Sequence, residues 1–479
     1  MFSSGSSQAA GQAGPRKWRL PAAQQERWVG SHGPTATIDD WGDRVRTGRL
    51  TRMGSIFFLL LAVVACSNTA TPSPTVVTSS AVPPTPSAIP TPSPTASPLP
   101  TATPSPLPTA TPSPRPMAPA TLRPGPKMTT AREGQTAVRL ADGRVLILGG
   151  IVSFPGKCEM ACIEPATASV EIYDPRTGKF SHDGSLAQAR VGANAVLLSD
   201  ATVLVMGGGY GAPVETMEIY DPAMGTSALV KLPANVASLP AEAATSLLAD
   251  GRVLIAGGTY NNSSTSNATL VFNPANGTFD NGPLMAKPRQ EATATLLVDG
   301  RVLIVGGEDS GSWNDDAEVI DPSRPLAKST LLQTVYPLEP VAPETPITLS
   351  DGRVLVAASG SSAVAGCSAP SDFEVFDPRT DELSYPARMI TPHSGASAIR
   401  VGDGRVLFFG GLDSHCAPAV TVEAFDPDSG TLQVVATGFP KITGFSATLL
   451  DDGEILIAGG SDANVYWNGQ TAKSWLLKP

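Results

Sequence analysis

The feature that most constrains the fold is a repeated segment of ten residues, first found at 141–150 as Ala-Asp-Gly-Arg-Val-Leu-Ile-Leu-Gly-Gly. Six further copies, some of them imperfect, follow at intervals of roughly fifty residues, at 199–208, 249–258, 298–307, 350–359, 402–411 and 451–460. A period of this length is typical of solenoids and propellers. Asp-Gly favours a tight hairpin turn, and the apolar run after it reads as the returning strand. The final Gly-Gly lets the backbone leave that strand where a side chain would collide.

Each repeat contains four strand signals, which in the first repeat cover 135–140, 145–148, 170–173 and a stretch around 179–180. The third signal ends in Asp-Pro-Arg-Thr-Gly, a sequence that favours a type I turn with a glycine exit. Five more repeats carry a related third strand, and the last has only a weak version at 465–468. Four antiparallel strands in each of the seven repeats predict an all-β, seven-bladed β-propeller. A six-bladed ring with one extra repeat is the alternative.

Two recurrent elements carry a resemblance to a known family. Gly-Gly closes the second strand, and Tyr or Phe followed by Asp-Pro closes the third, as in Kelch repeats. The Asp-Gly-Arg-Val-Leu form looks most like the Kelch units of galactose-oxidase-type propellers, and the resemblance covers 121–479. Departures occur in the second repeat at 200–202, in the fifth at 358–359 and in the seventh at Glu454. We expect residues 120–123 to close the ring as an outer strand beside 474–477.

The chain before the repeats divides into three segments. Residues 1–52 read as a disordered or non-native N-terminal extension, with translation starting further downstream. Residues 53–65 read as a signal-peptide hydrophobic region behind a basic stretch, and the Val-Val-Ala that precedes Cys66 resembles a bacterial lipoprotein cleavage box. That resemblance implies lipidation of Cys66. The alternatives are an ordinary secretory signal and a short membrane anchor. Residues 66–120 form a Pro/Thr/Ser-rich linker that favours extended polyproline II, leaving 121–479 for the propeller.

The charge distribution restricts the possible partners. The formal net charge is −10, and residues 66–479 carry 25 basic against 39 acidic side chains, a charge of −14. Such an acidic chain is not expected to bind nucleic acid or to be held electrostatically on anionic lipid. We therefore expect an exported protein attached to the bacterial cell envelope, facing outside the cytoplasm, with membrane contact through the lipid anchor only.

Charged residues that recur at one place in most repeats are expected to be structural. One set follows the Asp-Gly turn: Arg144, Arg252, Arg301, Arg353 and Arg405. A second set lies in the third strand: Glu171, Glu218, Glu318, Glu374 and Glu423. Both sets are expected to make ion pairs within a blade or contacts within a turn. A third set precedes the first strand, at the channel mouth or in a structural role: Arg132, Arg190, Arg289 and Arg388.

The long loops between the second and third strands are the predicted binding surface. They differ between repeats and lie on the face opposite the short turns, and variable loops on a rigid scaffold commonly carry function. Their aromatic, carboxylate and amide side chains suit sugar rings or a cationic peptide; solvated loops with incidental aromatics are the alternative. The candidate ligand-binding residues are Tyr210, Tyr260, Asn261, Glu308, Asp309, Trp313, Asp315, Asp413 and His415.

Four cysteines lie in these loops in addition to Cys66. An even number in an exported chain favours disulfides. Cys158 and Cys162 share the first loop, whereas Cys367 and Cys416 lie in adjacent repeats, which predicts the pairs Cys158–Cys162 and Cys367–Cys416. A metal site made by Cys416, His415 and His393 is the alternative, and no metal is expected.

The galactose-oxidase resemblance implies a copper site made of two histidines, two tyrosines and a cysteine cross-linked to one tyrosine. After residue 66 the chain has only His182, His393 and His415, and no such constellation can be matched. We therefore predict a surface-tethered, non-catalytic module without a cofactor that recognises glycan or protein through its long loops. A copper-dependent alcohol oxidase and a purely structural envelope protein are the alternatives; the ligand and the oligomeric state stay open.

Overall fold

The computed structural model describes residues 117–153, 165–209, 214–233, 236, 238–260, 264–314, 316–332, 346–359, 371–393, 395–413, 415–462 and 469–479. All regular elements in these ranges are β-strands. Within them, no helix is long and apolar enough to cross a membrane. The predicted extension, signal region, Cys66 and nearly all of the linker lie outside the described residues.

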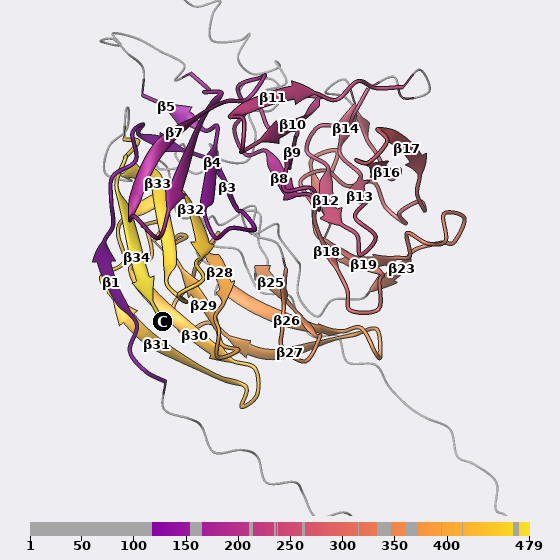
Figure 1. Ribbon diagram of the computed structural model, residues 1–479. Coiled ribbons are helices and arrows are strands. Elements are labelled where there is room, and N and C mark those ends of the chain that lie inside the picture. Colours follow the sequence, from indigo (N-terminus) through magenta and orange to yellow (C-terminus); the bar gives the residue numbers. More distant parts are fainter. Residues whose placement is uncertain are drawn as a thin grey trace, which may run out of the picture. The chain divides into compact units, whose positions relative to one another are not determined.

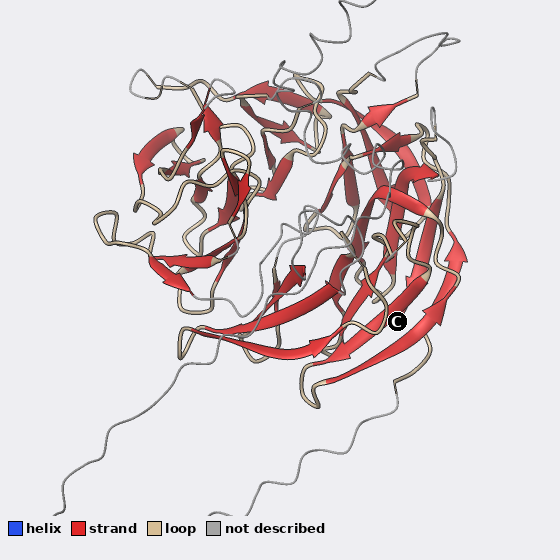
Figure 2. Cartoon of the chain, turned by 180° about the vertical axis from the view of Figure 1, so that it is seen from behind, coloured by secondary structure: helices blue, strands red, loops and turns tan. Residues whose placement is uncertain are grey.

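Seven four-stranded antiparallel sheets form a propeller ring, which confirms the predicted fold class (Figures 1 and 2). Blades one and two contain β3 (Thr136–Arg139), β4 (Val145–Leu148), β6 (Ser169–Asp174), β7 (Lys179–Ser185), β8 (Asn194–Leu197), β9 (Val203–Met206), β10 (Met217–Asp221) and β11 (Thr226–Leu229). Blades three and four contain β12 (Ala244–Leu247), β13 (Val253–Ala256), β16 (Thr269–Asn273), β17 (Thr278–Asn281), β18 (Thr293–Leu296), β19 (Val302–Val305), β22 (Ala317–Ile320) and β23 (Thr330–Leu332).

The remaining blades follow the same order, except that the seventh takes its outer strand from the start of the domain. Blades five and six contain β24 (Ile347–Thr348), β25 (Val354–Ser359), β26 (Ser371–Asp377), β27 (Glu382–Arg388), β28 (Ser397–Arg400), β29 (Val406–Phe409), β30 (Thr421–Asp426) and β31 (Thr431–Thr437). Blade seven contains β32 (Ile442–Leu449), β33 (Ile455–Asp462), β34 (Ser474–Lys478) and β1 (Thr121–Pro124).

The apolar run of each second strand is explained by its position between two neighbouring blades. Side chains alternate between the two faces of a strand. In β4, Leu146 and Leu148 pack into the core shared by blades one and two, whereas Val145 and Ile147 pack into the core shared by blades seven and one. All four are at most 2% exposed. A continuous apolar run, instead of an alternating one, is therefore required at this position.

Strand β1 closes the ring as predicted. Its residues pair antiparallel with β34, from Thr121 opposite Lys478 to Pro124 opposite Trp475. The backbone N–H of Ala120 also donates to the carbonyl of Val435 in blade six at 2.9 Å. One prediction needs correction, because the third strand of blade seven is β34 and not 465–468. No Asp-Pro turn is needed after β34, since its outer neighbour arrives from the other end of the domain.

The arginine of each Asp-Gly-Arg turn contacts the aspartate of the same turn, as predicted. Arg144 Nε, for example, lies 2.7 Å from an Asp142 carboxylate oxygen. The four equivalent arginines make the same contact at 2.5 to 2.8 Å. Arg301 reaches further and donates to Asp381 at 2.9 Å and to the carbonyl of Pro378 at 2.7 Å, both in the next blade. These arginines therefore stabilise the short-turn face.

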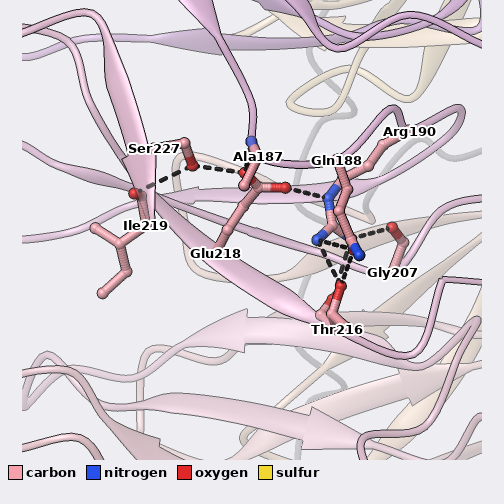
Figure 3. A network of polar contacts seen from close by, with 8 residues as sticks. All are labelled: Ala187, Gln188, Arg190, Gly207, Thr216, Glu218, Ile219 and Ser227. Carbon is pink, nitrogen blue, oxygen red and sulfur yellow. Dashed lines mark hydrogen bonds and ion pairs between the residues drawn. The ribbon is translucent and has the colours of Figure 1, made fainter. Parts of the chain in front are cut away.

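A buried ion pair holds the segment that enters blade two (Figure 3). Arg190 Nε donates to Glu218 at 2.6 Å, and Arg190 Nη1 donates to the carbonyls of Gly207 and Thr216 at 2.7 and 3.0 Å. Glu218 also accepts the backbone N–H of Ala187 at 2.5 Å. Both charged side chains are at most 1% exposed. This contact, which we call the blade joint, ties the entering segment to the second and third strands.

The blade joint recurs in three other blades. Arg132 pairs with Glu171 at 2.8 Å, and Arg289 pairs with Glu318 at 2.7 Å. In each case the basic residue contacts the carbonyl of a glycine 17 residues later. In blade six this position is held by His393, whose Nδ1 lies 2.8 Å from the carbonyl of Gly410.

This position corrects the prediction for Arg388. That residue is the exposed last residue of β27, in blade five, and lies further from the next first strand, β28, than the other three arginines lie from theirs. The other three arginines of the set, Arg132, Arg190 and Arg289, are structural, because each is buried in a blade joint.

The blade joint also explains the Gly-Gly pair. Gly149 has a φ of 64°, and a Cβ placed there would lie 2.3 Å from the carbonyl oxygen of Arg190 in the next blade. The N–H of Gly150 donates to that same oxygen at 2.8 Å. Only glycine permits both the left-handed backbone and the close approach. The carbonyl of Arg289 likewise accepts the N–H of Gly258 at 2.6 Å. Arg190 and Arg289 therefore each contact their own blade through the guanidinium and the preceding blade through the carbonyl.

Breaking one blade joint should cost stability because it leaves a buried charge without its partner. Arg190→Ala is expected to lower the free energy of unfolding by about 3–5 kcal/mol, whereas the double variant Arg190→Met with Glu218→Leu, which removes both charges, should cost much less. Chemical denaturation of the full chain checks both values. A single variant as stable as the double variant would contradict the structural role of the pair.

Candidate functional site

Blade three lacks both charged members of the blade joint. In blade one, Ile147 of the second strand pairs with Glu171. The same register in blade three places Leu270 opposite Ile255. Pro240 occupies the arginine position of the joint, which lies 17 residues before Gly257, the first glycine of the pair. The entering segment of blade three is therefore not held by a buried arginine and glutamate.

Blade seven lacks the pair as well, but there large side chains fill the space. Its register places Trp475 opposite Ile457, in the glutamate position. Trp475 packs against the core between blades six and seven, and that core includes the buried Ile442 at the arginine position. The loss of the ion pair in blade seven is therefore compensated by apolar packing.

In blade three the corresponding region is open. A pocket of about 560 Å³, which we call the blade-three pocket, is lined by Val236, Ser238, Tyr260, Leu270, Phe279, Asp280 and Asn281. Pockets that bind small ligands commonly measure roughly 300–1,000 Å³. Leu270, which is smaller than the Trp475 at the same position in blade seven, thus lies beside a concavity of ligand size.

The wall of the blade-three pocket comes from four separate segments. Val236 and Ser238 belong to the segment that enters the blade. Tyr260 lies in β14 (Thr259–Tyr260), which pairs with β15 (Ser264–Thr265) inside the long loop between the second and third strands. Strand β16 provides Leu270, and the outer strand β17 provides the other three residues, with Asn281 paired opposite Leu270. The pocket therefore lies at the long-loop end of these strands, on the face predicted to bind ligands.

Four of the lining residues are polar, and one of them, Asp280, is paired opposite Val271 and so faces away from Leu270 and Phe279. Among the described residues, no hydrogen bond or ion pair engages the side chains of Ser238, Tyr260, Asp280 or Asn281. Burial raises the pKa of the Tyr260 phenol, which therefore stays protonated at neutral pH and can donate a hydrogen bond. Leu270 and Phe279 add apolar surface beside these groups. The lining therefore combines polar groups with a smaller apolar surface.

Two of the other predicted residues stabilise their own hairpin. Glu308 and Asp309 form β20 (Glu308–Asp309), which pairs with β21 (Ser312–Trp313). A Glu308 carboxylate oxygen accepts the N–H of Gly311 at 2.9 Å, and an Asp309 oxygen accepts the hydroxyl of Ser310 at 3.0 Å. These contacts shape a turn, and neither residue lines the blade-three pocket.

Asp413 and His415 likewise lie away from the pocket, in the long loop of blade six. An Asp413 oxygen accepts the backbone N–H groups of His415 and Ala417 at 2.8 and 3.0 Å, so this carboxylate organises its own loop. The His415 side chain is 86% exposed. Of the predicted binding residues whose side chains the structure describes, Tyr260 is the one that lines the blade-three pocket.

The other predictions concern residues that lie outside the described part of the chain. Tyr210, Asn261, Asp315, Cys158, Cys162 and Cys367 belong to this group, as does the side chain of Trp313. Cys416 is described, in the loop of blade six with a φ of 58°. The two proposed disulfide pairs therefore stay predictions.

The described histidines do not form a copper site of the kind that the resemblance implies. His393 is 1% exposed, and its two ring nitrogens contact the carbonyl of Gly410 and the hydroxyl of Thr421, at 2.8 and 3.1 Å. His182 lies exposed in the outer strand β7. Within the described ranges, no group of three or more His, Cys, Asp or Glu residues is placed to hold a metal ion. Among the described residues, His182 and His393 therefore do not contribute to a donor set of the kind that the resemblance implies.

Comparison with known proteins supports the fold alone. Neither a family model nor a curated protein matches the chain. Among solved structures, the chain resembles one described as a novel fungal alcohol oxidase with catalytic diversity among the AA5 family, in complex with copper. The TM-score is 0.54 and the identity 16%, over 74% of this chain and 76% of that one. The chain is thus a seven-bladed β-propeller with a fold similar to that of galactose-oxidase-like AA5 enzymes.

Proposed function

We propose that this protein is a recognition module that binds glycan or protein through the long-loop face of its propeller, with the blade-three pocket as the principal site. The observation that carries the proposal is a pocket of ligand size lined by Ser238, Tyr260 and Asn281, whose side chains have no hydrogen-bond partner among the described residues. A ligand that fills the pocket displaces the water that hydrogen-bonds to these side chains. A ligand that replaces those hydrogen bonds therefore binds more tightly than one that does not.

The composition of the pocket favours binding over catalysis. Asp280 is the single carboxylate among its described lining residues, and no histidine, cysteine or lysine is found among them. Hydrolysis of a glycoside commonly requires two carboxyl groups on opposite sides of the bond. A copper-dependent alcohol oxidase is the second candidate, favoured by the fold likeness to an AA5 enzyme. The histidine positions count against it, because His393 is held in a blade joint.

The proposed setting is the outer surface of a bacterial cell envelope. Lipidation of Cys66 would attach the chain to a membrane, and the linker at 66–120 would hold the Kelch-type propeller at a distance from it. A polyproline II linker acts as a semi-rigid spacer. The closing strand β1 follows the linker directly, so the tether would join the propeller at its ring closure.

Substitution of the proposed lipidation site should release the protein from membranes. In cells that express the full chain, Cys66→Ser is expected to move the protein from the membrane fraction to the soluble exported fraction, because the hydrophobic anchor is lost. Fractionation with immunoblotting checks this, and mass spectrometry of the native N-terminus identifies the lipid. An unchanged membrane fraction would contradict the anchor.

Substitutions in the pocket should remove ligand binding. Tyr260→Ala is expected to weaken binding at least about tenfold on an array of glycans and cell-wall polysaccharides, or to envelope proteins in a pull-down. Leu270→Trp should also abolish binding, because it places in blade three the residue that fills this position in blade seven. His415→Ala, on the same face but outside the pocket, is the matched control and should bind like the native chain.

Two results would overturn this proposal. Binding that survives both Tyr260→Ala and Leu270→Trp, each shown to be folded by circular dichroism, would place the ligand elsewhere. Stoichiometric copper in the purified protein, together with oxidation of primary alcohols, would favour the oxidase.

A further inference from the structure

We propose that a groove between blades two and three, on the short-turn face, binds a partner protein. The groove takes a leucine-like side chain of this partner, and a neighbouring lysine or arginine of the partner pairs with Asp200. This surface lies at the opposite end of the strands from the blade-three pocket, and it goes beyond the recognition function proposed above. The inference follows from the shape and apolar wall of the groove and from the charge of blade two.

The groove, which we call the turn groove, lies where the first strands of blades two and three end. Its volume is about 400 Å³, and its wall consists of Leu197, Leu198, Ser199, Leu247, Leu248, Ala249, Asp250 and Gly251. Leu198 and Leu248 also pack into the apolar cores, so they are held in place. Leu247, in contrast, is 36% exposed. An apolar side chain in the groove would remove this leucine surface from water, which favours binding.

The turn that borders the groove on the side of blade two departs from the repeat. Five other repeats have Asp-Gly-Arg in this turn, and in each of them the arginine pairs with the aspartate. Blade two has Asp200-Ala201-Thr202, and no ion pair engages Asp200 among the described residues. The hydroxyl and the N–H of Thr202 donate to the Asp200 carboxylate at 2.6 and 3.0 Å. These hydrogen bonds lower the pKa of Asp200, so it is an anion at neutral pH.

Blade two supplies no cation for this carboxylate. Residues 191–230 contain no lysine, arginine or histidine. Glu218, in the third strand, is paired with the buried Arg190, whereas the turn aspartate has no such partner. Across the groove, Arg252 lies 2.7 Å from Asp250 of its own turn. A cationic side chain is therefore the group that complements this edge of the groove, and charge complementarity of this kind selects partners.

The repeat itself provides variants that are expected to fold. Ala201→Gly with Thr202→Arg restores the common turn, and the new arginine should pair with Asp200 within the chain. Ala201 has a φ of 67°, a left-handed conformation that glycine adopts more readily, so the change suits the backbone. Leu247→Arg places at the end of β12 the residue type that ends the first strands of blades one and six, where it is exposed.

The test selects random peptides displayed on phage for binding to the full-length protein. Peptides that bind the native chain but not Leu247→Arg are expected to carry a leucine-like side chain beside a lysine or arginine. Fluorescence anisotropy with synthetic copies of these peptides then measures affinity. Leu247→Arg should weaken binding at least about tenfold. The restored turn and Asp200→Asn should each weaken it about fivefold at low salt. Asp309→Asn, on the long-loop face, is the control and should leave it unchanged.

Three results would overturn this proposal. The first is that no selected peptide depends on Leu247. The second is that the selected peptides are acidic, or bind the restored turn as tightly as the native chain. The third is a dimer in analytical ultracentrifugation that dissociates when the turn is restored, because a second copy of the chain would then occupy the groove. Leu270→Trp should leave peptide binding unchanged, so this surface and the blade-three pocket are tested separately.

Discussion

In blades one, two and four, a buried ion pair joins the segment that enters the blade to the third strand of that blade. Removing two charges from water is costly, and the cost is offset only where hydrogen bonds satisfy both groups. Arg190 and Glu218 meet this requirement through the carbonyls of Gly207 and Thr216 and the N–H of Ala187. Where the next blade has a joint arginine, its carbonyl lies so close to Gly149, Gly257 or Gly459 that a Cβ would collide with it. In these blades one contact therefore accounts for the arginine, the glutamate and the first glycine.

Most of the fold could be predicted because its signals are local. Asp-Gly turns, apolar second strands and Asp-Pro turns each specify a neighbouring strand, and their repetition specifies the ring. Predictions failed where the determinant was distant in sequence. The third strand of blade seven lacks the Asp-Pro signal because β1 arrives from the other end of the domain. Arg388 resembled the other recurrent arginines, but the joint position is set by its spacing from the glycine pair, where blade six has His393.

The site was less predictable than the fold, because its groups come together only in the folded chain. Tyr260 stood out as an aromatic residue in a long loop, whereas Asp280 and Asn281 lie in an outer strand that looks unremarkable in sequence. Glu308 and Asp309 have the composition of a binding loop, yet their carboxylates are used within a hairpin. The available signal was Leu270, which replaces a glutamate found at the same place in five other repeats.

Whether this departure from the repeat creates a binding site is most directly tested by a crystal structure of the protein with the glycan or peptide that binds it most tightly on the array or in the pull-down. We expect electron density for this ligand in the blade-three pocket, in contact with Tyr260. Density for the ligand in the central channel or beside another blade, with none in the blade-three pocket, would contradict it.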